Sequence, residues 1–184
     1  MNDLSKYNDL ELLRMMKSDK KSCEIAFAEI YSRYSQKVYA YYLRTLDETD
    51  PITDLYQDTF VKFYERYAYT PDVSNILGLL LRISRNLTIN YKRDKKYQIE
   101  LDENDYPTLD KDDISDEENF YIEYALKSLD DELRELFVLK YYEDMTYEQI
   151  SDLTGLNSST IRTKVSRAKE KLKNLLTPYI EELR

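Results

Sequence analysis

Residues 146–172, TYEQISDLTGLNSSTIRTKVSRAKEKL, constrain the fold of this chain more than any other part of its sequence. Thr146 and Gln149 have the spacing of a capping box, which predicts that a helix begins directly after the threonine. Gly155, one of only two glycines in the chain, predicts the end of that helix, because glycine tolerates the left-handed conformation of a helix terminus. Asn157 is placed to cap a second helix. The segment therefore predicts two helices joined by a tight turn.

The second predicted helix combines an apolar stripe with a basic surface. Apolar side chains recur along it at helical spacing and are expected to pack against the rest of the domain: Ile161, Val165, Ala168, Leu172 and Leu175. The remaining surface carries six basic residues against the single acidic Glu170: Arg162, Lys164, Arg167, Lys169, Lys171 and Lys173. Such a face suits DNA phosphates, and a helix-turn-helix motif places the N-terminal residues of its second helix in the major groove. A solvated amphipathic helix without a DNA partner is the alternative interpretation.

The acidic charge of the whole chain does not exclude a nucleic-acid partner, because the charge is unevenly distributed. The chain has 27 Lys and Arg residues against 36 Asp and Glu residues, a net charge of −9. Residues 100–118 alone carry a net charge of −9, so the rest of the sequence is neutral overall. That neutral remainder contains a second basic cluster: Arg82, Arg85, Lys92, Arg93, Lys95 and Lys96. Phosphate contacts are screened within about 10 Å at ordinary salt, so local clustering matters more than overall charge.

The composition predicts an all-helical protein with limited means for catalysis. Two glycines and four prolines leave few residues for hairpin turns. With no histidine, one cysteine and no glycine-rich phosphate loop, the chain is not predicted to be an enzyme or to bind a metal or other cofactor. No apolar run approaches the roughly 18 residues that a membrane span needs. The N-terminus lacks a signal-peptide core, so we expect a cytoplasmic protein that does not insert into a membrane.

Four helices are predicted in the first half of the chain. Asp9 is expected to cap a short helix, and Ser22 is expected to cap a long one that runs to about Leu46. The next two helices are expected over residues 52–67 and from residue 74 or 75 to residue 96. The side chains expected to be buried in the second and third helices are Phe27, Ile30, Tyr31, Tyr34, Val38, Tyr41, Tyr42, Leu55, Phe60, Phe63 and Tyr64.

The predicted fold is all-α, with two small helical domains joined by a flexible acidic linker. The first domain covers residues 1–97. Residues 98–118 are expected to form the linker, because they are highly charged and poor in apolar side chains. The second domain covers residues 119–184 and contains the helix-turn-helix, preceded by helices near 116–128 and 130–142.

The order of these parts resembles the extracytoplasmic-function group of sigma-70-type RNA polymerase sigma factors, and the resemblance covers nearly the whole chain. In the third predicted helix, DLYQDTF is similar to the family's Asp-x-x-Gln-Glu-x-Phe motif, which contacts the clamp helices of the polymerase beta-prime subunit. The resemblance implies that Asp54, Gln57 and Asp58 bind polymerase, and their spacing places them on one helix face. A solvated acidic patch is the alternative.

The segment LLLRISRNLTINYKRDKK is similar to the family's minus-10 region, an apolar and aromatic run followed by Arg-Ile-Ala-Arg-Asn and a basic tail. The resemblance implies that minus-10 DNA is bound by Arg82, Arg85, Asn86, Lys92 and Arg93. Leu79 and Leu81 depart from the usual tryptophan and tyrosine, which changes core packing more than DNA chemistry. In the preceding loop, Tyr67 and Tyr69 are candidate stacking surfaces for a base flipped from the melted strand.

GLNSSTIRTKVSRAKEKL follows the family's region 4 pattern, Gly-Ile-Ser-x-Gly-Thr-Val-Lys-Ser-Arg-x-x-Arg-Ala-Arg, almost position by position. Ser159 replaces the second glycine, and Ser166 stands at a more variable site. The resemblance implies that minus-35 bases are contacted by Arg162, Thr163, Ser166 and Arg167, and phosphates by Lys164 and Lys169. Ser158 and Ser159, at the start of the same helix, complete the predicted minus-35 surface.

The resemblance implies an alternative sigma factor, which binds core RNA polymerase through the beta-prime clamp helices and the beta flap. It would direct the polymerase to promoter DNA and help to melt the minus-10 element without catalysing a covalent step. The family commonly has an anti-sigma factor as a further partner. Two other classes of protein fit parts of the sequence. A conventional helix-turn-helix regulator would bind DNA without polymerase, and a helical interaction protein would bind polymerase without recognising promoters.

Overall fold

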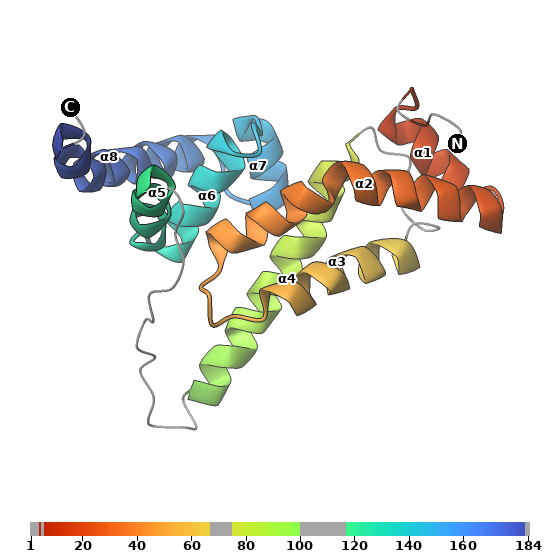
Figure 1. Ribbon diagram of the computed structural model, residues 1–184, viewed down its shortest axis with the longest axis horizontal. Coiled ribbons are helices and arrows are strands. Elements are labelled where there is room, and N and C mark those ends of the chain that lie inside the picture. The colour runs from red at the N-terminus through yellow and green to blue at the C-terminus, as the bar shows by residue number, and fades with distance from the viewer. Residues whose placement is uncertain (1–3, 5, 67–74, 100–116, 183–184) are drawn as a thin grey trace. The chain divides into compact units, whose positions relative to one another are not determined.

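The computed structural model describes residues 4, 6–66, 75–99 and 117–182 (Figure 1). Within these ranges it contains eight α-helices and no β-strand, which confirms the predicted all-α fold. The chain divides into two compact units, unit 1 (Met1–Arg93) and unit 2 (Asp94–Arg184). In the described part of the chain, no helix is both long enough and apolar enough to span a membrane.

Unit 1 is built from α1 (Asp9–Met16), α2 (Lys20–Thr45), α3 (Ile52–Arg66) and all but the last turns of α4 (Ile76–Ile99), which continues past the boundary at Arg93 (Figure 1). Each contributes to one apolar core, whose fully buried side chains include Leu12, Tyr41, Phe63 and Leu80. The helix boundaries agree with the predicted ones to within three residues at the ends of α3 and α4. The predicted starts of α1 and α2 are one and three residues too late, because other residues cap these helices.

The predicted caps of α1 and α2 are both wrong. Asn8, not Asp9, caps α1: its side chain accepts a hydrogen bond from the Glu11 backbone N–H at 2.9 Å, and the Glu11 carboxylate accepts one from the Asn8 N–H at 2.8 Å. The Asp9 carboxylate makes tertiary contacts instead: it accepts hydrogen bonds from the Tyr34 hydroxyl at 2.5 Å and from the Ile76 backbone N–H at 2.7 Å. The Asp9 side chain thus joins α1 to α2 and to the first residue of α4.

The N-cap of the long helix α2 lies three residues before the predicted one. Asp19 is the N-cap, and Ser22 donates to it twice, from its backbone N–H at 3.1 Å and from its hydroxyl at 2.6 Å. These hydrogen bonds from Ser22 lower the pKa of the Asp19 carboxyl. Ser22 is therefore the third residue of the helix rather than its cap, and its hydroxyl adds a second charge-assisted hydrogen bond to the capping carboxylate.

A buried polar cluster fixes α4 against α2 and α3. The Tyr42 hydroxyl on α2 lies 2.8 Å from Thr59 Oγ1 on α3 and donates a hydrogen bond at 3.3 Å to the backbone carbonyl of Ser84 on α4. Thr59 Oγ1 also lies 3.3 Å from Ser84 Oγ. All three side chains are buried, and burial raises the pKa of the Tyr42 hydroxyl, so the phenol stays protonated and can donate. The faces of α3 and α4 that point to solvent are therefore held in a fixed relation.

Two aromatic side chains predicted to be buried are substantially exposed. Tyr31 is 42% exposed and Tyr64 is 39% exposed. Their rings still pack edge-on against phenylalanines of the α2–α3 contact, with Tyr31 4.8 Å from Phe60 and Tyr64 5.1 Å from Phe27 between centroids. They lie at the solvent edge of that contact, where one part of each ring is covered, and the Tyr31 hydroxyl accepts a hydrogen bond from the Tyr56 hydroxyl at 2.7 Å.

Unit 2 contains α5 (Glu117–Lys127), α6 (Asp131–Tyr141), α7 (Tyr147–Thr154) and α8 (Ser158–Glu182). Part of its core forms where α5, the turn after it and α6 pack on α8, and consists of Ala125, Leu126, Leu129, Leu133, Ala168 and Leu172. The predicted apolar stripe of α8 is confirmed except at its end. Leu175 is 39% exposed, whereas Leu176 packs against the core.

Candidate functional site

The α7–turn–α8 segment has the geometry that its sequence predicts. Thr146 Oγ1 accepts from the Gln149 N–H at 3.2 Å, and the Gln149 side chain accepts from the Thr146 N–H at 2.8 Å, which completes the capping box. Gly155 ends α7 with a left-handed φ of 76°. Asn157 then accepts a hydrogen bond from the Thr160 N–H at 2.8 Å. Local hydrogen bonds and one glycine therefore set the turn between the two helices.

The solvent face of α8 brings most of the predicted minus-35 residues together. Its exposed side chains are Ser159, Arg162, Thr163, Ser166, Arg167 and Lys169. Because an α-helix turns by about 100° per residue, these positions lie opposite the buried stripe of Ile161, Val165 and Ala168. The other two predicted residues, Ser158 and Lys164, are half-buried.

The first helix of the motif orients one of these cations. The guanidinium carbon of Arg162 lies 5.1 Å from the centre of the Tyr147 ring, and its Nη2 lies 4.0 Å from Glu148 Oε1. Both partners belong to the first turn of α7. The Arg162 side chain is nevertheless 62% exposed, so α7 directs the guanidinium without removing it from solvent.

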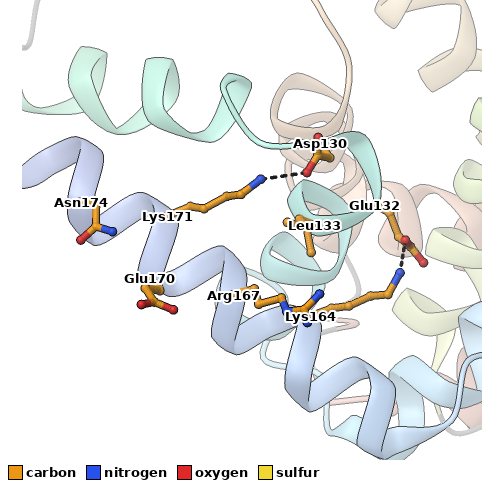
Figure 2. A pocket seen from close by; sticks show the side chains of 8 residues that line it. All are labelled: Asp130, Glu132, Leu133, Lys164, Arg167, Glu170, Lys171 and Asn174. Carbon is orange, nitrogen blue, oxygen red and sulfur yellow. Dashed lines mark hydrogen bonds and ion pairs between the residues drawn. The ribbon is translucent and has the colours of Figure 1, made fainter.

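The opposite edge of α8 is paired with the start of α6 (Figure 2). Lys164 forms an ion pair with Glu132, and Lys171 Nζ lies 3.0 Å from Asp130 Oδ2. The hydrogen bond from Lys171 and its positive charge hold the pKa of the Asp130 carboxyl below its usual value. These side chains line an open groove between α6 and α8 with a volume of about 530 Å³. Figure 2 shows how they lie around it. The sequence did not predict these pairs, since their partners are 32 and 41 residues apart.

The predicted minus-10 residues on α4 share one face but differ in exposure. Arg82, Asn86 and Arg93 are exposed, whereas Arg85 and Lys92 are half-buried. Tyr67 and Tyr69 lie outside the described residues. The structure adds one residue that the sequence analysis missed: Ile89 is 45% exposed between these polar positions.

The predicted polymerase-binding residues are all exposed on α3. Asp54, Gln57 and Asp58 face solvent from consecutive turns. Val61 lies four residues after Gln57 and three after Asp58, so it continues this face, and it is 53% exposed. The sequence carries a signal for both Val61 and Ile89, because each is an apolar residue among polar ones on the same face of a helix.

Among the described residues, no group of three or more His, Cys, Asp or Glu side chains could hold a metal ion.

Two family models match the two units. The model of sigma-70 region 2 matches residues 30–97, which include α3 and nearly all of α4. The model of sigma-70, region 4 matches residues 119–172, which include the α7–α8 pair. The candidate surfaces on α3, α4 and α8 therefore all lie inside matched regions.

Individual relatives agree over almost their whole length. RNA polymerase sigma factor YlaC of Bacillus subtilis (strain 168) is 30% identical over 167 residues, which cover 85% of this chain and 95% of the relative. ECF RNA polymerase sigma factor SigW of the same organism is 25% identical, with 91% and 98% covered. The sigma factor RpoE from Bartonella quintana, solved in complex with the anti-sigma factor NepR, has a similar fold. Its TM-score is 0.73 at 22% identity, covering 82% of this chain and 96% of RpoE. With both regions matched and a relative of this similarity covered almost completely, the chain belongs to the extracytoplasmic-function group of the sigma-70 family of RNA polymerase sigma factors.

Proposed function

We propose that three helical faces divide the work of this alternative sigma factor. The exposed face of α3 binds core RNA polymerase, the basic face of α4 binds the minus-10 element, and the solvent face of α8 binds the minus-35 element. The single observation that carries this assignment is the α7–α8 pair, whose left-handed turn at Gly155 leaves a polar and basic helix face exposed. That face supports DNA binding through the N-terminal half of α8.

On α8, the proposed base contacts are made by Arg162, Thr163, Ser166 and Arg167. Arginine can donate two parallel hydrogen bonds to a guanine edge, and short hydroxyl side chains allow the helix to approach the groove closely. Ser158, Ser159 and Lys169 are proposed to contact the flanking backbone. Lys164 can contact a phosphate only after it leaves Glu132, with which it forms an ion pair.

On α4, we propose that Arg82, Asn86 and Arg93 bind the minus-10 strand, with Arg85 and Lys92 contributing from the edge of the face. Strand opening needs no covalent step in this scheme, because paired and stacked bases are exchanged for contacts with protein. Tyr67 and Tyr69 are retained as proposed stacking partners for a flipped base. The buried Tyr42–Thr59–Ser84 cluster would keep this face aligned with the polymerase-binding face of α3.

On α3, the proposed polymerase contact combines three polar side chains, Asp54, Gln57 and Asp58, with the exposed Val61. The expected partner surface is the beta-prime clamp helices, while the beta flap is the expected partner of unit 2. An anti-sigma factor is a further proposed partner, in keeping with the complex in which the related fold of RpoE was solved. Polymerase and promoters are cytoplasmic in bacteria, so we propose that this chain acts there and catalyses no reaction of its own.

The decisive experiment combines the purified chain with core RNA polymerase and a library of genomic fragments from the source organism. We expect transcripts that neither protein produces alone. The double variant Asp54→Lys/Asp58→Lys serves as the matched control, because it should remain folded and support no transcripts. If the chain binds specific DNA tightly without polymerase and never directs transcription, it is a conventional helix-turn-helix regulator instead.

A further inference from the structure

Two of the basic side chains of α8 are already bound to carboxylates of the same unit. Lys164 pairs with Glu132, and Lys171 Nζ lies 3.0 Å from Asp130 Oδ2 (Figure 2). The two lysines are seven residues apart, so they lie about two helical turns apart along one edge of α8. Asp130 and Glu132, called the α6 acidic pair, thus face the edge of the helix to which DNA binding is assigned.

The position of Asp130 shows that its carboxylate is directed towards α8. Asp130 occupies the N-cap position of α6, yet its side chain makes no capping hydrogen bond. Its carboxylate instead accepts a hydrogen bond from Lys171. Capping therefore does not explain why an acidic residue stands here, whereas contact with α8 does.

We propose that the α6 acidic pair is an internal competitor for DNA phosphates, which lowers the affinity of the free protein for DNA of any sequence. The inference rests on the proposed function, because it requires that α8 be the DNA-binding helix. Each carboxylate presents to its lysine the charge and the acceptor oxygens that a phosphate would present. DNA must therefore displace Glu132 from Lys164 and Asp130 from Lys171 before these lysines can contribute.

The competition is weak enough to be reversed by DNA. All four side chains are partly exposed, from 28% for Lys164 to 73% for Asp130, and exposed ion pairs are among the weakest in proteins. Non-specific binding depends almost wholly on phosphate contacts, whereas promoter binding adds base contacts. Lowering the phosphate contribution leaves the base contacts and the polymerase to supply a larger share of promoter affinity.

Salt dependence gives the test a quantitative form. Each phosphate neutralised on duplex DNA contributes a slope of about −0.9 to the logarithm of affinity against the logarithm of salt concentration. If both lysines are released from competition, the slope should become steeper by up to about 1.8, which is two such contributions. Affinity for a random-sequence duplex should rise several-fold at low salt and converge on the wild-type value at high salt.

The experiment measures fluorescence anisotropy of a labelled random-sequence duplex with the full chain over a salt series. The test variant is Asp130→Asn/Glu132→Gln, which keeps the side-chain shapes and removes two negative charges. The matched control, Glu24→Gln/Glu65→Gln, makes the same charge change at exposed positions of unit 1. We expect tighter binding and the steeper slope in the test variant, and a much smaller change in the control.

A second pair of variants separates competition from general repulsion. In a Lys164→Gln/Lys171→Gln background, the acidic-pair substitutions should give no gain in affinity, because no lysine remains to be released. The same gain in that background, or an equal gain from the control variant, would overturn the proposal. Transcription with core polymerase separates failure of this proposal from failure of the proposed function. If the wild-type protein directs transcription but the test variant gains no affinity for the random-sequence duplex, only the competitor proposal is rejected. If the wild-type protein directs no transcription from promoters, the proposed function is rejected.

Discussion

Gly155→Ala tests the turn on which the candidate DNA-binding face depends. Gly155 has a φ of 76°, and a Cβ added there would meet no heavy atom within 4 Å. The substitution therefore introduces backbone strain without a steric clash. A left-handed conformation costs an L-residue about 1–2 kcal/mol, and the lower freedom of alanine in the unfolded chain offsets about 0.4–1 kcal/mol of this. We expect the free energy of unfolding of unit 2 to fall by about 1 kcal/mol, which is roughly a fivefold change in its unfolding equilibrium.

Hydrogen exchange measured by mass spectrometry reports this loss locally. Peptides from α7 and α8 should exchange about fivefold faster in Gly155→Ala, while peptides from α2 in unit 1 should be unchanged. Gly155→Asn should lose less, because asparagine tolerates the left-handed region better than alanine. Gly78→Ala, within α4, is a control that should leave α7 and α8 unaffected. Unchanged exchange in α7 and α8 of Gly155→Ala would show that the strain argument is wrong.

Three further predictions concern binding. Arg167→Ala should cost about 1–3 kcal/mol of binding free energy for the cognate minus-35 element, whereas Lys169→Ala should weaken binding modestly on every sequence. If the two variants lose activity on the same promoters of a library, the assignment of α8 is refuted. Asp54→Lys/Asp58→Lys should abolish capture of core polymerase in a pull-down and leave helical circular dichroism unchanged, because both side chains are exposed; unimpaired capture would remove this interface. Replacing the acidic residues of segment 100–118, whose net charge is −9, with Ser and Gly should strengthen binding of promoter fragments at low salt. Equal affinities in a low-salt titration would reduce that segment to a spacer.

The sequence alone determined the features whose causes lie within a few residues. Thr146 and Gln149 satisfy each other's backbone across three positions, and Gly155 alone supplies the left-handed turn. The amphipathic spacing of α8 predicted both its buried stripe and its polar face. The family motifs on α3, α4 and α8 are equally local, so the resemblance to sigma factors could be recognised without a structure.

Tertiary structure decided which of several equivalent local choices is used. Asp9 was a reasonable cap, but the Tyr34 hydroxyl and the Ile76 N–H bind its carboxylate, and Asn8 caps the helix instead. At the end of α8, both Leu175 and Leu176 could have continued the apolar stripe. The rest of unit 2 packs on the side of the helix that carries Leu176, so Leu176 is covered and Leu175 is exposed.

The charge available on α8 also depended on tertiary structure. Six basic residues could be counted in the sequence, but only the fold brings Asp130 and Glu132 against two of them. Helical periodicity fixes which side chains share a face, because it follows from backbone geometry alone. It carries no information about what lies opposite that face. Electrostatic partners are chosen by distance in space, and residues 32 and 41 positions apart become neighbours only when α6 packs on α8.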